Sequence, residues 1–291
     1  MIFLFIVPVL ATVKVLCQGA LSKRSVKCAR DAVMMNARIF AIVAVFLAAI
    51  FFREIPDSRI IIYAAVYAAS IVAFQSVYMM AFRSGPISLT STISDFYVVF
   101  PLAVGVIFYN EVDKLTCFTA VGLVAMAVSF ILIPGNKNER SANKKWLALA
   151  IFATVLSGAA SVSMLVFARN EELAPYKTYY VMYSYVIAAV LAFIVGSFMP
   201  KGARQTDGEK RKPDYTAVIL TVATAVALGL HNVSATYGIQ LNDGMLYYPV
   251  TNVATIILTS FSDVIIFRQN LSKRSAIGII FGAVAVVLTS L

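Results

Sequence analysis

Charged residues are scarce in this sequence. Only 13% of its 291 residues are charged, whereas 60% are hydrophobic. Soluble domains average about 45–50% apolar and about 25% charged residues. A single core of this size cannot bury so much apolar surface, so much of it must face lipid. The composition therefore excludes a soluble globular protein, and no polar stretch is long enough to form a separate soluble domain.

Histidine and cysteine are also rare. His231 is the one histidine, and the three cysteines stand apart without CxxC spacing. These residues offer no set of ligands for a typical zinc site. The sequence also lacks a Walker loop, a GxSxG nucleophile motif and an HExxH motif. We therefore expect no enzymatic activity, no cofactor and no metal.

Positive charge is in excess, with a formal net charge of +10. The basic residues lie in short loops between apolar segments, and no basic stripe with interleaved aromatic residues is present. Such a stripe is typical of nucleic-acid-binding proteins. We therefore expect no nucleic-acid partner, and instead contacts between the basic loops and anionic lipid headgroups.

Ten apolar segments of helical length follow one another along the chain. The hydrocarbon core of a bilayer takes about 20 apolar residues of α-helix. The first segment has no positively charged region before it, so we interpret it as a membrane helix rather than a signal peptide. The sequence predicts an all-α membrane protein whose transmembrane helices span 2–21, 32–52, 60–82, 87–109, 115–133, 147–168, 178–199, 216–238, 245–267 and 275–290.

The two halves of the chain have similar layouts. Five helices in each half is an odd number, so the second half must be inverted in the membrane. Inverted repeats are the architecture of alternating-access transporters. We predict two inverted five-helix repeats, at 1–134 and 146–291. Four positions recur 159 residues later: Tyr78, Gly85, Phe108 and Glu111 correspond to Tyr237, Gly244, Phe267 and Asn270.

Basic residues are concentrated in every second loop. The odd-numbered loops carry 17 Lys and Arg residues and the even-numbered loops carry 5. Because positively charged loops stay in the cytoplasm, this pattern favours cytoplasmic odd loops and both termini outside.

Several motifs near the end of each half carry a family resemblance. The layout resembles the EamA-like transporters of the drug/metabolite transporter superfamily, which have ten helices in two repeats. The resemblance implies secondary transport of a small solute through a cavity lined by the third, fourth, eighth and ninth helices, and both termini in the cytoplasm, the reverse of the loop-charge prediction. The matching features are Ala81 to Pro86 at the entry to the fourth helix, Pro101 within it, Glu111 in the following turn and Gly122 in the fifth helix, with a looser match at Ser260 and Asn270.

Inserting a charged side chain into the bilayer interior costs several kcal/mol, so each charged residue within a predicted membrane helix is a candidate functional or structural residue. Lys14 and Asp95 are predicted at a similar depth, about 9–12 Å below the surface formed by the odd loops. They are candidates for substrate charge or proton coupling, or for a structural pair. Arg38 is predicted at a comparable depth and can reach the headgroups by snorkelling. We expect Asp263 to form an ion pair at the membrane interface near Arg268.

Polar and aromatic residues gather in the third, fourth, eighth and ninth helices. They can hydrogen-bond a polar solute, but hydroxyl and amide groups also join helices to one another, and tyrosines also form belts at the interface. Pro101 and Pro249 each remove a backbone donor and predict a kink. The candidate binding or coupling residues are Lys14, Gln75, Tyr78, Ser94, Asp95, His231, Asn232, Tyr237, Tyr248 and Asn252.

These observations favour a secondary transporter of a small polar or amphipathic metabolite, located in a bacterial inner membrane as a multi-pass protein. The alternative is a non-transporting membrane protein, either receptor-like or an assembly subunit. Expected partners are the solute and membrane lipids. The small-xxx-small sequence Gly278 to Gly282 predicts close helix packing or a homodimer through the fifth and tenth helices. The solute, the direction of transport and the coupling ion stay open.

Overall fold

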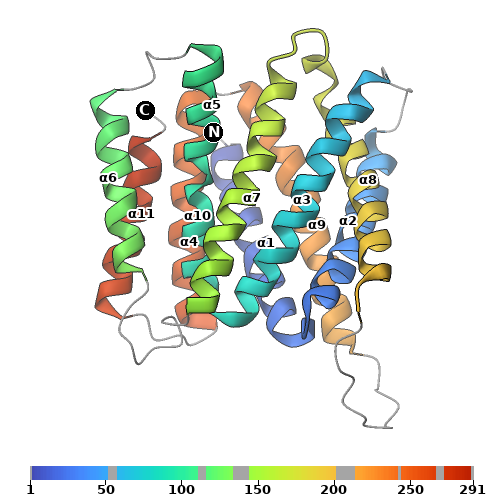
Figure 1. Ribbon diagram of the computed structural model, residues 1–291, viewed down its shortest axis with the longest axis horizontal. Helices are drawn as coiled ribbons and strands as arrows, with labels where there is room; N and C mark the ends of the chain where they lie inside the picture. Colours follow the sequence, from blue (N-terminus) through green and yellow to red (C-terminus); the bar gives the residue numbers. More distant parts are fainter. Residues whose placement is uncertain are drawn as a thin grey trace.

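The computed structural model describes residues 2–51, 58–110, 116–133, 144–200, 214–241, 244–266 and 272–289. All regular structure within these ranges is helical, which confirms the predicted all-α class, and the helices agree with the expected spans to within a few residues (Figure 1). The elements are α1 (Ile2–Ser25), α2 (Ala29–Phe51), α3 (Arg59–Ser84), α4 (Ile87–Asp95), η1 (Phe96–Val98), α5 (Val99–Tyr109), α6 (Cys117–Leu132), α7 (Lys144–Ala168), η4 (Ala174–Tyr176), α8 (Lys177–Phe198), α9 (Tyr215–Leu241), α10 (Gly244–Ile266) and α11 (Lys273–Leu288).

Seven helical segments in the described ranges are long and apolar enough to cross a membrane. One of them is Ile87–Tyr109, which joins α4, η1 and α5 into a single span. Large apolar side chains on these helices, including Val45, Ile62 and Phe198, are exposed, as lipid-facing residues must be. The protein is therefore a multi-pass helical membrane protein.

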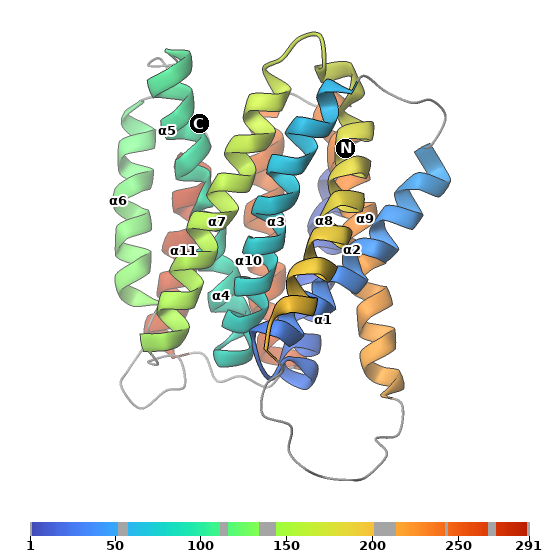
Figure 2. The same cartoon turned by 45° about the vertical axis from the view of Figure 1, so that its right-hand side comes forward.

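The helices lie side by side, and consecutive helices run in opposite directions (Figures 1 and 2). Both ends of the chain lie toward the same end of the bundle, and the turns from α1 to α2 and from α3 to α4 lie at the opposite end (Figure 1). We call this opposite end the lower end, as it is drawn. It is the end at which the basic odd-numbered loops begin.

Packing joins the first half of the chain to the second. The largest contacts are those of α2 with α8, α1 with α9, α3 with α7, and α6 with α11. Helix α1 also packs against α10, and α7 also packs against α4, η1 and α5. This arrangement places α1 in the middle of the molecule, in contact with α3, α4, α9 and α10.

Glycines allow α6 and α11 to approach closely. A Cβ atom on Gly122 would lie 2.8 Å from the backbone nitrogen of Thr289, and one on Gly278 would lie 3.0 Å from that of Ile133. A Cβ atom on Gly282 would lie 2.9 Å from the Cγ2 methyl group of Thr92 in α4. The small-xxx-small surface predicted from the sequence is thus used for packing within the chain, and the homodimer stays a prediction.

The fourth span is broken in mid-membrane. Helix α4 ends at Asp95, a 3₁₀ turn covers Phe96–Val98, and α5 begins at Val99. Pro101 follows in the first turn of α5 and has no N–H to donate to the carbonyl group of Tyr97. The 3₁₀ turn just before Pro101 places Asp95 at a helix end rather than inside a regular helix, and the kink at Pro101 stays a prediction.

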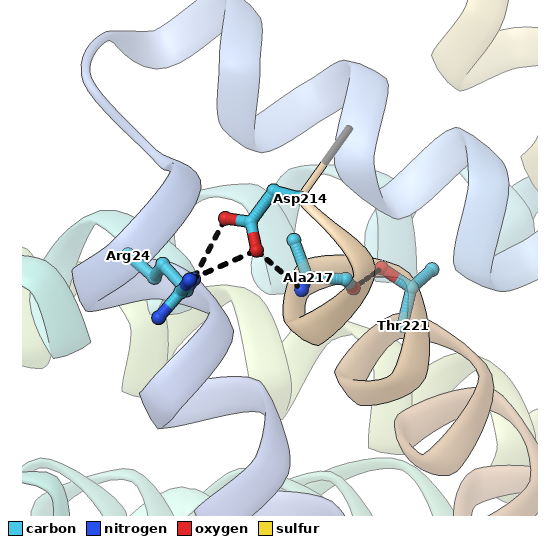
Figure 3. A network of polar contacts seen from close by, with 4 residues as sticks. All are labelled: Arg24, Asp214, Ala217 and Thr221. Carbon is cyan, nitrogen blue, oxygen red and sulfur yellow. Dashed lines mark hydrogen bonds and ion pairs between the residues drawn. The ribbon is translucent and has the colours of Figure 1, made fainter. Parts of the chain in front are cut away.

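An exposed ion pair joins the lower ends of α1 and α9 (Figure 3). The Arg24 guanidinium donates two hydrogen bonds to Asp214, at 2.7 Å and 2.9 Å, and these bonds lower the pKa of the Asp214 carboxyl. Asp214 also accepts a hydrogen bond from the backbone N–H of Ala217, in the first turn of α9. The pair therefore caps α9 while holding the end of α1 beside it. Because both side chains are exposed, its stabilising effect is small and weakens with salt.

Candidate functional site

Two buried glutamines fix the position of α1 against α3. The Gln18 amide donates a hydrogen bond of 2.6 Å to the side-chain oxygen of Gln75, and both residues are buried. Lys14 precedes Gln18 by four residues, so it lies on the same face of α1. The glutamine contact therefore directs Lys14 toward the interior of the bundle.

Asp95 lies opposite Lys14, at the end of α4. The two charges are close enough to attract each other, and the Asp95 carboxylate also lies near the Tyr78 hydroxyl of α3. Tyr78 itself is buried and lies against Ser91, one turn before Asp95. The Asp95 Oδ2 atom is buried and has no hydrogen-bond partner.

His231 of α9 also lies near Lys14. The imidazole lies near the Lys14 ammonium and near the backbone carbonyl group of Val7 in α1. Its Nδ1 atom is buried without a hydrogen-bond partner. Lys14 therefore lies near both Asp95 and His231. We call the group Lys14, Gln18, Gln75, Tyr78, Asp95 and His231 the central polar cluster.

The three titratable groups of this cluster are only half-buried. Lys14, Asp95 and His231 retain partial exposure, whereas Gln18, Gln75 and Tyr78 are buried. Each of these three side chains therefore keeps some surface that no neighbouring side chain covers. The cluster can therefore offer a cation, an anion and an imidazole to a small polar molecule.

The remaining candidate binding residues either lie outside the central polar cluster or have side chains outside the described part of the structure. Ser94 is buried on α4 next to Asp95, and Asn252 is half-buried on α10. The Asn232 amide donates a 2.7 Å hydrogen bond to the buried Tyr185 hydroxyl, which joins α9 to α8. Arg38 is exposed on α2. The side chains of Tyr237, Tyr248 and Pro249 lie outside the described part of the structure.

Gln18 was missed by the sequence analysis. Its spacing of four residues from Lys14 and the polar character of both residues were the available signal. In the described ranges, no three His, Cys, Asp or Glu side chains gather as metal ligands.

Asp263 has a different position from the one predicted. It is fully buried, and its Oδ2 atom accepts hydrogen bonds from the backbone N–H of Ser88 at 2.9 Å and from the Ser88 hydroxyl at 2.7 Å. The expected ion pair at the membrane interface is therefore wrong, and Arg268 lies outside the described residues. The N-cap residue of α4 is Pro86, whose side chain cannot accept a hydrogen bond. Asp263 of α10 supplies the acceptor that this helix start lacks.

Substitution of Asp263 tests this capping contact. Asp263→Ala should destabilise the protein by about 1–3 kcal/mol, because Ser88 loses a buried hydrogen-bond acceptor. Asp263→Asn keeps an acceptor oxygen and should cost much less. Thermal unfolding in detergent, followed by circular dichroism, compares the two variants. Equal destabilisation by alanine and asparagine would show that the negative charge, and not the cap, is what matters.

Comparison with known proteins adds information on the fold. No protein-family model matches the sequence, and no curated protein matches it. A solved structure described as "Crystal structure of protein" aligns over 97% of this chain and 96% of its own, with a TM-score of 0.60 and 14% sequence identity. At this level of identity, the similarity shows that the whole chain shares one fold with a known structure.

Proposed function

We propose that the protein is a secondary transporter of a small polar or amphipathic metabolite, of the drug/metabolite transporter type, in a bacterial inner membrane. The observation that carries the proposal is the central polar cluster, where Lys14 of α1 lies near both Asp95 of α4 and His231 of α9. Charged groups at membrane depth are costly and usually mark a solute or proton path.

The packing pattern supports two inverted repeats, 1–134 and 146–291. By chain order, α1 corresponds to α7 and α3 corresponds to α9. Helix α1 packs against α9, and α7 packs against α3, which is the same contact with the halves exchanged. Helices α2 and α6 pack against their own counterparts, α8 and α11. A pseudo-twofold axis between the halves accounts for all four contacts, and rocking of one half against the other would open the cluster alternately to each side.

The alternative is a non-transporting membrane protein. It predicts that polar side chains inside the bundle are hydrogen-bonded between helices, as Asn232 and Tyr185 are. Asp95 and His231 do not fit this description, because each has a buried polar atom without a hydrogen-bond partner. The transporter proposal gives Asp95 and His231 a role, which the alternative does not.

Uptake into proteoliposomes tests the proposal. The purified protein is reconstituted, and a panel of radiolabelled metabolites is offered with and without a pH gradient. We expect at least one solute to accumulate above the level in protein-free liposomes. A panel that covers amino acids, sugars, nucleosides and organic acids without any such uptake would contradict transport and favour the alternative.

A further inference from the structure

Two exposed ion pairs join the first half of the chain to the second. At the lower end, Arg24 of α1 contacts Asp214, which directly precedes α9, with 2.7 Å between Nε and Oδ2 (Figure 3). Arg59, the first residue of α3, contacts Glu172 in the turn after α7, with 2.7 Å between Nη1 and Oε2. Because α3 reaches the lower end at its last residue, this second pair lies at the opposite, upper end (Figure 1). Each end of the bundle therefore has an ion pair that crosses between the halves.

The two pairs occupy equivalent places in the proposed repeats. By chain order, α1 corresponds to α7 and α3 corresponds to α9. Each pair joins the end of the first helix of one repeat to the start of the third helix of the other repeat, α1 to α9 and α7 to α3. The signs are exchanged, because the first-helix partner is Arg24 in one repeat and Glu172 in the other. An exchange of the two halves therefore converts the lower pair into the upper pair.

One partner in each pair is held by local structure. Asp214 accepts a backbone N–H from the first turn of α9, and Arg24 binds it through two nitrogen atoms. Glu172 precedes the buried Leu173, whose N–H donates to the backbone and side-chain oxygens of Asn170. Partners held in this way lose less conformational freedom on pairing than two flexible surface side chains. The pairs are therefore suited to restrain the helices that they join, although exposure keeps each effect small.

We propose that these ion pairs are two latches, one for each side of the membrane. In the transport cycle, the Arg24–Asp214 pair breaks when the lower side opens, and the Arg59–Glu172 pair breaks when the upper side opens. This inference rests on the proposed rocking of the two halves, because opening of one side separates the halves at that end. Both pairs are formed in the structure, which is the arrangement expected between the two open forms.

Reversible cross-linking tests whether the pairs must break. The three native cysteines are first replaced by serine. Each ion pair is then exchanged for two cysteines, which a short bis-methanethiosulfonate reagent joins. We expect either cross-link to lower uptake to the level of protein-free liposomes, and a reducing agent to restore it. Uptake that continues through either cross-link would overturn the latch at that end. The variants are Arg24→Cys with Asp214→Cys, and Arg59→Cys with Glu172→Cys.

The matched control cross-links two positions within one half. Arg83 of α3 donates a hydrogen bond to the backbone carbonyl group of Lys27, and both residues are exposed at the lower end. A cross-link in the Lys27→Cys, Arg83→Cys variant should leave uptake unchanged, because both positions belong to the half that moves as a unit. Loss of uptake in this control as well would mean that any added rigidity stops transport, which contradicts a specific role for the two ion pairs.

A thiol-labelling rate tests the restraint without any solute. Ser94 is buried on α4, one turn after Thr90, whose hydroxyl accepts a hydrogen bond from Trp146 of α7, so it lies between the two halves. In detergent, the Ser94→Cys thiol should react with a maleimide about two- to fivefold faster when Asp214→Asn or Glu172→Gln removes one latch. This difference from the parent protein should shrink at about 1 M salt, which screens exposed charges. Unchanged labelling rates in both variants would overturn the proposal.

Failure of the latches is distinguishable from failure of transport. If uptake of a solute continues through both cross-links, the latches are wrong and the transporter proposal stands. If the uptake panel identifies no transported solute, the transporter proposal falls, and the labelling rates still decide whether the two pairs restrain the opening of the bundle.

Discussion

Replacing Asp95 by asparagine should abolish uptake of the transported solute. Asparagine has nearly the same shape, so the end of α4 can keep its conformation while the negative charge disappears. Lys14 then loses the carboxylate that attracts it. Because the proposal assigns this carboxylate to solute or proton binding, the initial rate of uptake should fall to the level of protein-free liposomes. Initial rates in proteoliposomes, normalised to the amount of reconstituted protein, measure the effect.

Two further variants sharpen this experiment. Lys14→Gln combined with Asp95→Asn removes both charges and should restore part of the structural stability that either single change loses, because no uncompensated charge remains. Arg38→Gln is the control for a basic residue predicted at similar depth but exposed on α2, and it should transport normally. Unchanged uptake by the Asp95→Asn variant would remove Asp95 from the mechanism.

The helices could be predicted from the sequence because apolar length is a strong local signal. Lys14 and Asp95 could be placed at similar depth because an α-helix rises by a constant amount per residue. The missing N–H of Pro101 predicts a kink in the fourth helix, and the 3₁₀ turn at Phe96–Val98 lies just before this residue. Each of these predictions used only the residues of the helix concerned.

The faces of the helices could not be predicted in the same way. Asn232 follows His231 directly, and its amide donates a hydrogen bond to Tyr185 of α8. Adjacent residues on a helix point about 100° apart, and the sequence does not state which neighbour each direction meets. The partner of Asp263 is Ser88, which is 175 residues away, so its buried position had no local signal.

The lower end of α4 is held by the second half of the chain. Asp263 of α10 caps its start, and Thr154 of α7 donates a 2.9 Å hydrogen bond to the carbonyl group of Ile93. The Trp146 indole N–H of α7 donates a 2.7 Å hydrogen bond to the Thr90 hydroxyl. If the two halves rock against each other, these contacts must break or move together before the lower side opens. Their strength therefore sets the stability of the arrangement that the structure shows.

Trp146 has the largest side chain among these residues, and its replacement by a small residue should have the greatest effect on stability. The side chain is fully buried. Trp146→Ala should destabilise the protein by about 3–5 kcal/mol, because it leaves a large cavity. Trp146→Phe keeps most of the ring and should cost considerably less. Because Trp146 is the one tryptophan of the chain, unfolding in detergent is best followed by circular dichroism.

Gly85 provides a specific test of this packing. A Cβ atom on Gly85 would lie 2.3 Å from Cδ1 of Trp146, so Gly85→Ala should destabilise the wild-type protein. The backbone at Gly85 is extended, with φ of −153°, a conformation that alanine adopts easily. In the Trp146→Ala background the clash is gone, and the same change should stabilise the protein by about 0.4–1 kcal/mol through the lower entropy of the unfolded chain. The effect of Gly85→Ala should therefore reverse its sign between the two backgrounds. A change in unfolding free energy of the same sign and size in both backgrounds would mean that Trp146 does not limit the space for a side chain at position 85.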